Sequence, residues 1–375
     1  MKRVSSPAEV LAEGVRRGVF PGAAAVVGRP GEVSFAGACG GFSHPEDERR
    51  VRVDTPYDVA SLTKPLVTVS CLLRLVARGV VALEQPVADL LPEFGQGDPR
   101  RQTVRVEDLV RHRSGLPAWR PYFLSAPLEP PRGKARQLPR PTPASRRLVL
   151  DRALAEPLAL GPGAEAVYSD VGFIVLGHLL ERAAGCSLVR LARREVFEPL
   201  GLSCGFVDLL GGDAPRKELP PTGFCLWRQG LVAGVVHDEN AYAMGGVAGH
   251  AGLFASAMDV FRIAVGYLEA YRGDSSWLEA GLVRRLFDSG CERSTWVGGW
   301  DTPSARGSSA GRLVSARAVG HLGFTGASVW IDLDREAVVA VASNRVHPDR
   351  HNPAIRWWRP LFHDAAFSHL DGEGQ

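Results

Sequence analysis

Lysine is scarce in this chain. Only Lys2, Lys64, Lys134 and Lys217 are present among its 44 basic residues, and the others are arginine. Arginine stays protonated in proteins, whereas a desolvated lysine can lose its proton and act as a base. A lysine three residues after Ser61, in "SLTK", therefore indicates a need for an amine that exchanges a proton.

Other absences exclude whole classes of function. The six cysteines include no CxxC pair, which gives no support for a zinc site or a disulfide framework. The net charge is only +3 and no dense basic run is interleaved with aromatics, so we expect no nucleic-acid partner. His237, Asp238, Glu239 and His250 are of metal-binding types but lack HxH or HExxH spacing. We expect neither a metal nor another cofactor, since no glycine-rich phosphate loop follows a strand.

Long apolar runs are also missing. The N-terminal segment lacks the apolar centre of a signal peptide, and no run approaches the ~18 apolar residues of a membrane helix. We expect a cytoplasmic protein with no membrane segment and a small-molecule substrate. A periplasmic location stays open if a leader has been removed, and the sequence does not indicate an oligomeric state.

Predicted strands cluster at the two ends of the chain and predicted helices in its middle. We expect one catalytic unit over 1–375, in which 1–58 and 312–375 combine into an α/β sheet part. Residues 59–311 form a mostly helical part, in which the Pro/Arg-rich segment 125–147 is a surface loop. A cleft between the two parts is the natural pocket, and Ser61 lies where the chain passes from one to the other.

The spacing of Ser61 and Lys64 favours chemistry at a helix start. Residues i and i+3 of a helix share a face, with Cβ atoms roughly 5–6 Å apart. Free N–H groups and the helix dipole there favour an alkoxide and disfavour a protonated amine. Pro65 is tolerated in a first turn, and it disfavours helical geometry at Lys64, which allows a tightened turn. Taken alone, an SxxK is more often a capping serine and a solvated lysine than a catalytic pair.

Two later motifs supply partners. "YSD" places Tyr168 and Asp170 directly before a strong helix, where Asp170 is also a plausible helix cap. "HLG" places His321 and Gly323 on a strand, and a glycine there lets another segment approach the backbone closely. A Ser-x-x-Lys element, a second polar motif and a Lys-Thr-Gly strand form a known serine-nucleophile set.

The three motifs stand here in that order, and the chain resembles the penicillin-recognising serine hydrolases, specifically the class C β-lactamase-related family. The resemblance covers about residues 20–347, through "FPGAAAVVGRPGEV", "YDVASLTKPLVT", "LVRHRSGLP", "YSDVGFIVLG", "GVAGHAGLFASAMDV" and "GHLGFTGASVWIDL". It implies an α/β fold of the α+β type, with an antiparallel sheet, flanking terminal helices and a helical insertion.

The resemblance also implies roles. Ser61 would be acylated, Lys64 would hold or accept its proton, and Tyr168 would be the second base on the leaving-group side. The N–H groups of Ser61 and Phe324 would form the oxyanion hole. Asp170, His321, Gly323 and, from its position in a loop near the cleft, Asn240 are candidate substrate-binding residues.

Two positions depart from the family pattern. Asp170 stands where the family more often has asparagine, and an ionised aspartate only accepts hydrogen bonds. It would repel an acidic substrate, or pair with Lys64 and raise the pKa of the amine. His321 stands where β-lactamases of this group carry lysine, and histidine is mostly neutral at pH 7. Both changes argue against a dedicated β-lactamase, because β-lactams carry a carboxylate.

We therefore predict a serine hydrolase that cleaves small esters or amides through an acyl-Ser61 intermediate, with carboxylesterase as the main activity. A D-amino-acid peptidase or DD-carboxypeptidase, or a weak β-lactamase, is the alternative. A non-enzymatic alternative is a penicillin-binding sensor with slow deacylation.

Overall fold

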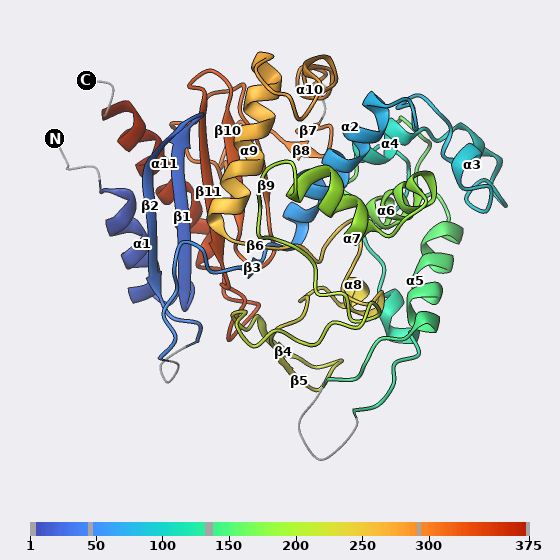
Figure 1. Ribbon diagram of the computed structural model, residues 1–375, viewed down its shortest axis with the longest axis horizontal. Coiled ribbons are helices and arrows are strands. Elements are labelled where there is room, and N and C mark those ends of the chain that lie inside the picture. The colour runs from blue at the N-terminus through green and yellow to red at the C-terminus, as the bar shows by residue number, and fades with distance from the viewer. Residues whose placement is uncertain (1–4, 44–47, 132–137, 291–293, 373–375) are drawn as a thin grey trace.

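A seven-stranded antiparallel sheet forms the centre of the fold in the computed structural model, which describes residues 5–43, 48–131, 138–290 and 294–372 (Figure 1). The strand order is β2-β1-β11-β10-β9-β8-β7. The strands of this sheet are β1 (Gly22–Arg29), β2 (Glu32–Gly40), β7 (Trp296–Val297), β8 (Trp300–Asp301), β9 (Val319–Leu322), β10 (Ser328–Asp332) and β11 (Ala337–Ser343). Two small ribbons pair β3 (Tyr57–Asp58) with β6 (Phe254–Ala255), and β4 (Gly223–Cys225) with β5 (Gly230–Val232).

The two ends of the chain meet in this sheet, as the sequence predicts. Strand β1 pairs antiparallel with β11, from Ala23 opposite Ser343 to Gly28 opposite Val338. Both strands are rich in alanine and valine and are buried, because each is covered on both faces. The sheet also takes in β7 and β8 from the region expected to be helical, so its C-terminal half starts at Trp296 and not near residue 312.

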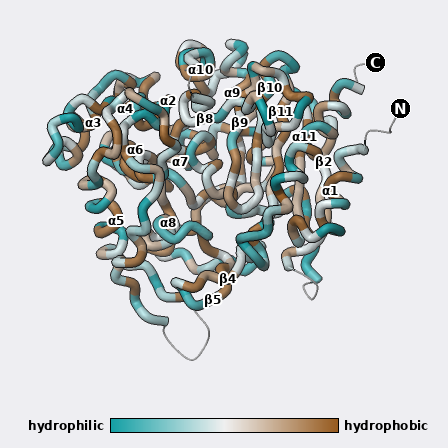
Figure 2. The backbone as a smooth tube through the Cα atoms, turned by 180° about the vertical axis from the view of Figure 1, so that it is seen from behind, coloured by the Kyte–Doolittle hydropathy of each residue, from teal (hydrophilic) through white to brown (hydrophobic). Residues whose placement is uncertain are grey.

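Helices cover both faces of the sheet. Helices α1 and α11 pack on one face around Phe20, Val339 and Trp358, and α9 packs on the other face against β1, β10 and β11. The helices are α1 (Pro7–Arg16), α2 (Ser70–Ala77), α3 (Val87–Leu90), α4 (Val106–Val110), α5 (Pro143–Ala155), α6 (Asp170–Ala184), α7 (Leu188–Ala192), α8 (Glu239–Ala243), α9 (Ala257–Arg272), α10 (Ala280–Phe287) and α11 (Ile355–Gly372). Hydrophobic stretches follow the central strands, and hydrophilic ones lie toward the rim at α3 and α10 (Figure 2).

The segment expected to be a loop to residue 147 ends earlier. Helix α5 already begins at Pro143, because the hydroxyl of Thr142 accepts from the N–H of Ser145 and proline suits a first helical position. Glu129 and Arg140 form an isolated bridge on either side of residues 132–137, which lie outside the described residues. The cap-and-proline signal at 142–143 therefore outweighs the loop-like composition.

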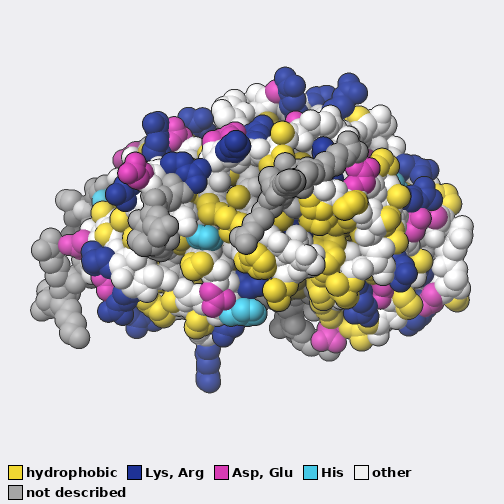
Figure 3. Space-filling model, turned by 90° about the horizontal axis from the view of Figure 1, so that it is seen from below, with side chains coloured by type: hydrophobic (Ala, Val, Ile, Leu, Met, Phe, Trp, Pro, Cys, Tyr) yellow, Lys and Arg dark blue, Asp and Glu magenta, His cyan; other side chains and the backbone are white. Residues whose placement is uncertain are grey.

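The hairpin β4–β5 is unusually apolar on its outside. Phe224, Leu226 and Leu231 are 56%, 85% and 51% exposed. Figure 3 shows hydrophobic side chains gathered on the face seen from below, the side on which this hairpin lies in Figure 1. The hairpin thus contributes exposed apolar surface to this face.

One helical stretch among the described residues, Ala60–Ala77, is long and apolar enough to cross a membrane by length and composition. The bent pair Asp170–Ala184 and Leu188–Phe197 passes the same test only if taken as one span. The Ala60–Ala77 stretch is 78% buried inside the protein, which accounts for its apolar character as a core helix.

Candidate active site

The turn before Ser61 is held in an unusual backbone conformation. Ala60 has a φ of 50°, a left-handed geometry that costs a non-glycine residue about 1–2 kcal/mol. The carboxylate of Asp58 stabilises it by accepting from the N–H of Ala60 at 2.8 Å and from the N–H of His237 at 2.6 Å. Burial raises the pKa of Asp58 to about 6. This buried clamp fixes the position of the following serine.

Ser61 lies in a 3₁₀ turn, Ala60–Leu62, and the chain then runs through a π-helical stretch, Lys64–Val69, into α2. Pro65 lacks an N–H, and its ring disfavours α geometry at the preceding residue, which agrees with the tightened first turn. The carbonyl of Pro65 accepts from Tyr267 Oη at 3.0 Å and from Ser70 Oγ at 3.3 Å. In the π-helical stretch Lys64–Val69, the Pro65 carbonyl is therefore hydrogen-bonded to side chains.

Lys64 is the centre of the polar cluster. Its buried Nζ donates to Ser61 Oγ at 3.0 Å, to Tyr168 Oη at 2.7 Å and to Asp170 Oδ1 at 2.6 Å. The carbonyl of His250 lies 3.3 Å from the same nitrogen, so the three N–H groups of the ammonium have four acceptors within reach. The structure thus brings together the three motif side chains that the sequence analysis singled out.

Asp170 sets the charge of this cluster. Burial lowers the pKa of Lys64, but the charge of Asp170 and the hydrogen bonds to Asp170 and Tyr168 outweigh burial and leave this pKa raised. Burial also raises the pKa of Tyr168, more than the ammonium of Lys64 lowers it. The resting pair is therefore a lysine cation beside a neutral phenol. The expectation that the helix start would favour a neutral lysine is overruled by the carboxylate, which is the pairing alternative foreseen for Asp170.

Aromatic rings surround Tyr168. His112 lies 4.8 Å and Trp296 lies 4.7 Å from it between ring centroids, and His321 lies 5.9 Å away. His112 Nδ1 accepts from the N–H of Ser169 at 3.0 Å, so it supports the loop that carries the phenol. His321 donates from Nδ1 to the carbonyl of Leu322 at 2.9 Å. Burial, with a smaller contribution from the charge of Lys64, lowers the pKa of His321 to about 3, so this ring is neutral at working pH.

The end of β9 packs directly against the serine turn. A Cβ atom on Gly323 would lie 2.5 Å from the carbonyl oxygen of Val59, so only glycine fits there. Arg359 on α11 donates to the carbonyls of Gly323 and Ala327 at 2.8 and 2.9 Å. The close approach predicted for Gly323 is present, and it brings the backbone of Phe324 to the cavity that Ser61 lines.

A cavity of about 660 Å³ opens over the cluster. Its lining residues include Ser61, Tyr168, Asp170, His321, Gly323 and Phe324, together with Trp119, Trp296, Asp301, Arg345 and Arg350. Most of its surface is apolar or aromatic, with a few polar groups that converge on the serine, as in small-molecule sites generally.

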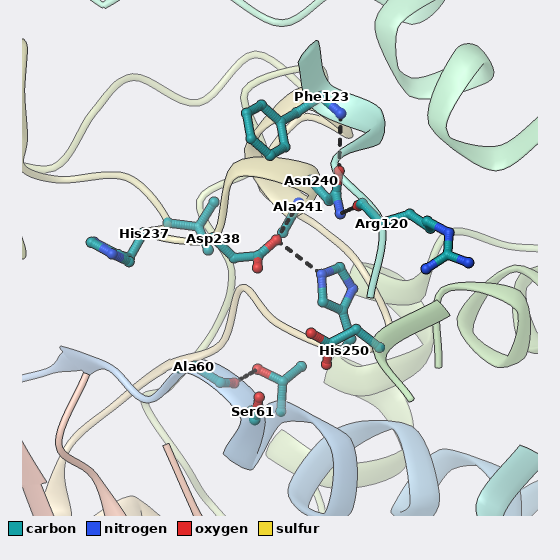
Figure 4. Close-up of polar contacts among 12 residues, drawn as sticks. Ala60, Ser61, Arg120, Phe123, His237, Asp238, Asn240, Ala241 and His250 are labelled. Atoms are coloured by element: carbon teal, nitrogen blue, oxygen red, sulfur yellow. Dashed lines mark hydrogen bonds and ion pairs between the residues drawn. The ribbon is translucent and has the colours of Figure 1, made fainter. Parts of the chain in front are cut away.

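Asn240 does not lie in the cavity lining. Its Oδ1 accepts from the N–H of Phe123 at 3.0 Å and its Nδ2 donates to the carbonyl of Arg120 at 2.8 Å, as Figure 4 shows. Both polar atoms of this buried side chain are occupied by backbone, so the substrate-binding role predicted for Asn240 is not supported. It ties α8 to the segment that carries Trp119.

His250 and Asp238 also differ from the metal-ligand pattern considered for them. His250 Nε2 lies 2.9 Å from Asp238 Oδ1, and Figure 4 shows the imidazole pointing at the carboxylate. Burial opposes ionisation of Asp238, but the charge of His250 and the hydrogen bond outweigh it and lower the pKa of Asp238. In the described part of the chain no three His, Cys, Asp or Glu residues are grouped to hold a metal ion.

Sequence reasoning missed the supporting residues. Asp58 in "YDVASLTK" and Trp296 in the short β7 carry no recognisable spacing, because their contacts join elements far apart in the chain. Asp301, in the cavity wall, was also missed.

Comparisons with known proteins decide the family. The family model described as Beta-lactamase matches residues 8–360. The chain belongs to the beta-lactamase family. Within this family, it is 29% identical over 327 residues to a "Putative D-alanyl-D-alanine carboxypeptidase" of Escherichia coli (strain K12), covering 82% of this chain and 73% of the relative.

Solved structures of other proteins share the fold of this beta-lactamase family member. EstCE1, a hydrolase with promiscuous acyltransferase activity, superposes with a TM-score of 0.70 at 20% identity, covering 96% of both chains. Unliganded simvastatin synthase (LovD) from Aspergillus terreus gives 0.69 at 19% identity, also covering 96% of both. The fold and the class of serine hydrolase predicted from the sequence are thereby confirmed.

Proposed function

We propose that this protein hydrolyses small esters or amides through an acyl-Ser61 intermediate, with a carboxylesterase-type activity. The observation that carries the proposal is the convergence of Ser61 Oγ and Tyr168 Oη on Lys64 Nζ, at 3.0 and 2.7 Å, beside a substrate-sized cavity. A nucleophile within hydrogen-bond reach of an orientated base is the general signature of covalent catalysis.

The acylation step depends on which group accepts the proton of Ser61. Ser61 Oγ bonds to the substrate carbonyl carbon, the bond to the leaving group breaks, and the serine proton needs an acceptor. Because Lys64 is a cation at rest, only molecules in which the Lys64–Tyr168 pair has lost one proton can accept it. The pair then passes this proton to the leaving group through Tyr168. The N–H groups of Ser61 and Phe324 stabilise the oxyanion.

Deacylation reverses the sequence with water. Water gives a proton to the pair as its oxygen attacks the acyl carbonyl, and Ser61 Oγ recovers a proton as it leaves. Both half-reactions then use the same proton-carrying side chains, and the rate rises with pH.

A carboxylesterase is favoured over a DD-carboxypeptidase by the charges near Tyr168. A DD-peptide carries a carboxylate on its leaving group, whereas His321 is neutral and the Lys64 cation is already paired with Asp170, so neither offers that carboxylate a free positive charge. The name of the Escherichia coli relative keeps the peptidase as the second candidate.

The first test is ester turnover by Ser61→Ala. We expect kcat/KM for a short-chain nitrophenyl ester to fall by ~10³-fold or more, as for removal of other serine nucleophiles. Ser5→Ala, exposed and outside the cavity, is the matched control. Full turnover by Ser61→Ala would reject the assignment.

A substrate panel separates the alternatives. A chromogenic cephalosporin reports β-lactamase activity, a D-alanyl-D-alanine peptide reports carboxypeptidase activity, and a fluorescent penicillin reports a slow-deacylating binder. We expect nitrophenyl ester turnover to exceed all three. Lasting penicillin label without ester turnover would favour the sensor.

A further inference from the structure

The cavity over Ser61 is lined by four acidic residues, and three of them are paired with a base. Asp170 Oδ1 lies 2.6 Å from Lys64 Nζ. Asp238 Oδ1 lies 2.9 Å from His250 Nε2, and Glu239 Oε1 lies 2.9 Å from Arg350 Nη1. These carboxylates are committed to the protein itself.

Asp301 is the exception. Its Oδ1 accepts from the N–H of Thr302 at 3.0 Å, and the side chain of Thr295 also hydrogen-bonds to the carboxylate. No cation among the described residues pairs with it. Burial raises the pKa of Asp301. Asp301 is half-buried in the cavity wall, and among the described acidic residues of that wall it is the one whose charge no base offsets.

The position of Asp301 relates it to the leaving group. Asp301 on β8 is the register partner of Trp296 on β7, and the Trp296 ring lies 4.7 Å from that of Tyr168. Tyr168 is the group that delivers a proton to the leaving group in the proposed mechanism. A leaving group that extends from Tyr168 along Trp296 therefore reaches Asp301.

The cavity lining near Phe324 carries side chains of the reverse charge. Arg345 and Arg350 lie over Phe324, at 4.8 and 5.1 Å from its ring centroid. Arg345 already donates to the carbonyls of Phe324, Arg350 and Asn352. Because Arg350 is paired with Glu239, the positive charge beside Phe324 comes from Arg345. The cavity is thus positive beside Phe324 and negative beside Trp296, which orients a substrate whose leaving group is positively charged.

We propose that Asp301 and Trp296 form a subsite for a cationic leaving group, so that esters or amides of amino alcohols and amines are the preferred substrate class. The inference rests on the proposed function. The carboxylate supplies charge attraction, and the indole face supplies a cation–π contact.

The test compares two esters of the same shape. The acetate of 2-(trimethylammonio)ethanol carries one positive charge, and the acetate of 3,3-dimethylbutanol is its neutral counterpart. We expect kcat/KM of the wild-type protein to favour the cationic ester by about tenfold or more. Asp301→Asn should bring this ratio toward one, whereas Asp334→Asn, which removes a surface charge outside the cavity, should keep it.

Each outcome decides the matter. A wild-type ratio near one, or a ratio that survives in Asp301→Asn, would overturn the subsite. If neither ester is hydrolysed, the proposed function fails separately. Calorimetric binding of the two free alcohols then decides the subsite, which predicts tighter binding of the cationic alcohol by wild type and equal binding by Asp301→Asn. The wild-type comparison holds even if the variant does not fold.

Discussion

At the scale of single residues, the decisive feature is the carboxylate of Asp170 beside the amine of Lys64. Without it, burial would lower the pKa of the lysine and leave a ready base. With the Asp170 carboxylate beside it, Lys64 keeps its proton at neutral pH. The residue that distinguishes this chain from the commoner asparagine pattern is therefore a regulator of proton affinity.

Asp170→Asn tests this role. Removing the negative charge lowers the pKa of Lys64 and also that of Tyr168, because Asp170 raises both. We expect the alkaline rise of kcat/KM to move to lower pH and the activity at pH 7 to increase. The buried ammonium loses its counterion, so the free energy of unfolding should fall by about 1–3 kcal/mol. A pH–rate profile that coincides with that of wild type would contradict the argument.

At the scale of elements, the site depends on how closely β9 approaches the serine turn. Gly323→Ala places a Cβ atom 2.5 Å from the carbonyl oxygen of Val59, and both groups are backbone-bound and cannot move aside. We expect the unfolding free energy to fall by about 1–3 kcal/mol and ester turnover by tenfold or more. Thermal unfolding and nitrophenyl ester kinetics check both effects.

Gly205→Ala is the matched control, since a Cβ atom at Gly205 meets no atom within 4 Å. It should change stability and turnover little. An active, fully stable Gly323→Ala would mean that the β9 end is more compliant than its contacts indicate.

Some of these helices and strands could be predicted from the sequence, and others could not. Local patterns predicted the helix that follows Tyr168 and the strands of both chain ends. These signals lie within a few residues, where propensity and capping act. The short strands β7 and β8 lack such signals, because the pairing of β8 with β9 that holds them in the sheet is decided by tertiary contacts.

The residues of the candidate site likewise divide into those that a short motif could place and those whose place depends on tertiary contacts. Ser61, Lys64 and Tyr168 could be placed together because each belongs to a short motif whose order matches a known set. Asn240 was misplaced, since a loop sequence does not reveal which backbone groups its amide meets. The pairing of charges in the cavity, and hence the isolation of Asp301, depends on distances that no single sequence encodes.

At the scale of the whole molecule, buried neutral histidines make stability depend on pH. Burial, foremost, lowers the pKa of His237, His321 and His363 to about 3, against an ordinary value of 6.5. Between these values the unfolded chain binds more protons, so stability is lost as pH falls from about 6.5 toward 3. Each histidine contributes about 1.4 kcal/mol per pH unit within that window. Asp58 opposes this loss of stability, because its raised pKa of about 6 lets the folded chain keep a proton that the unfolded chain releases.

We therefore expect Tm to fall steeply between pH 6.5 and pH 4.5, with net proton uptake on unfolding. Calorimetry in buffers of different ionisation enthalpy measures that uptake directly. A Tm that stays constant over this range would show that the histidines are charged in the folded protein.

The pairing of β1 with β11 governs the order of events during biosynthesis. Ser61, Lys64 and Tyr168 all leave the ribosome well before Ala337–Ser343, the strand against which the N-terminal hairpin must align. The nascent chain therefore carries its nucleophile for most of translation without a finished sheet to hold β9 and Phe324 beside it. We expect a peptide released before this strand is made to be inactive and prone to aggregation, because β1 then lacks its sheet partner.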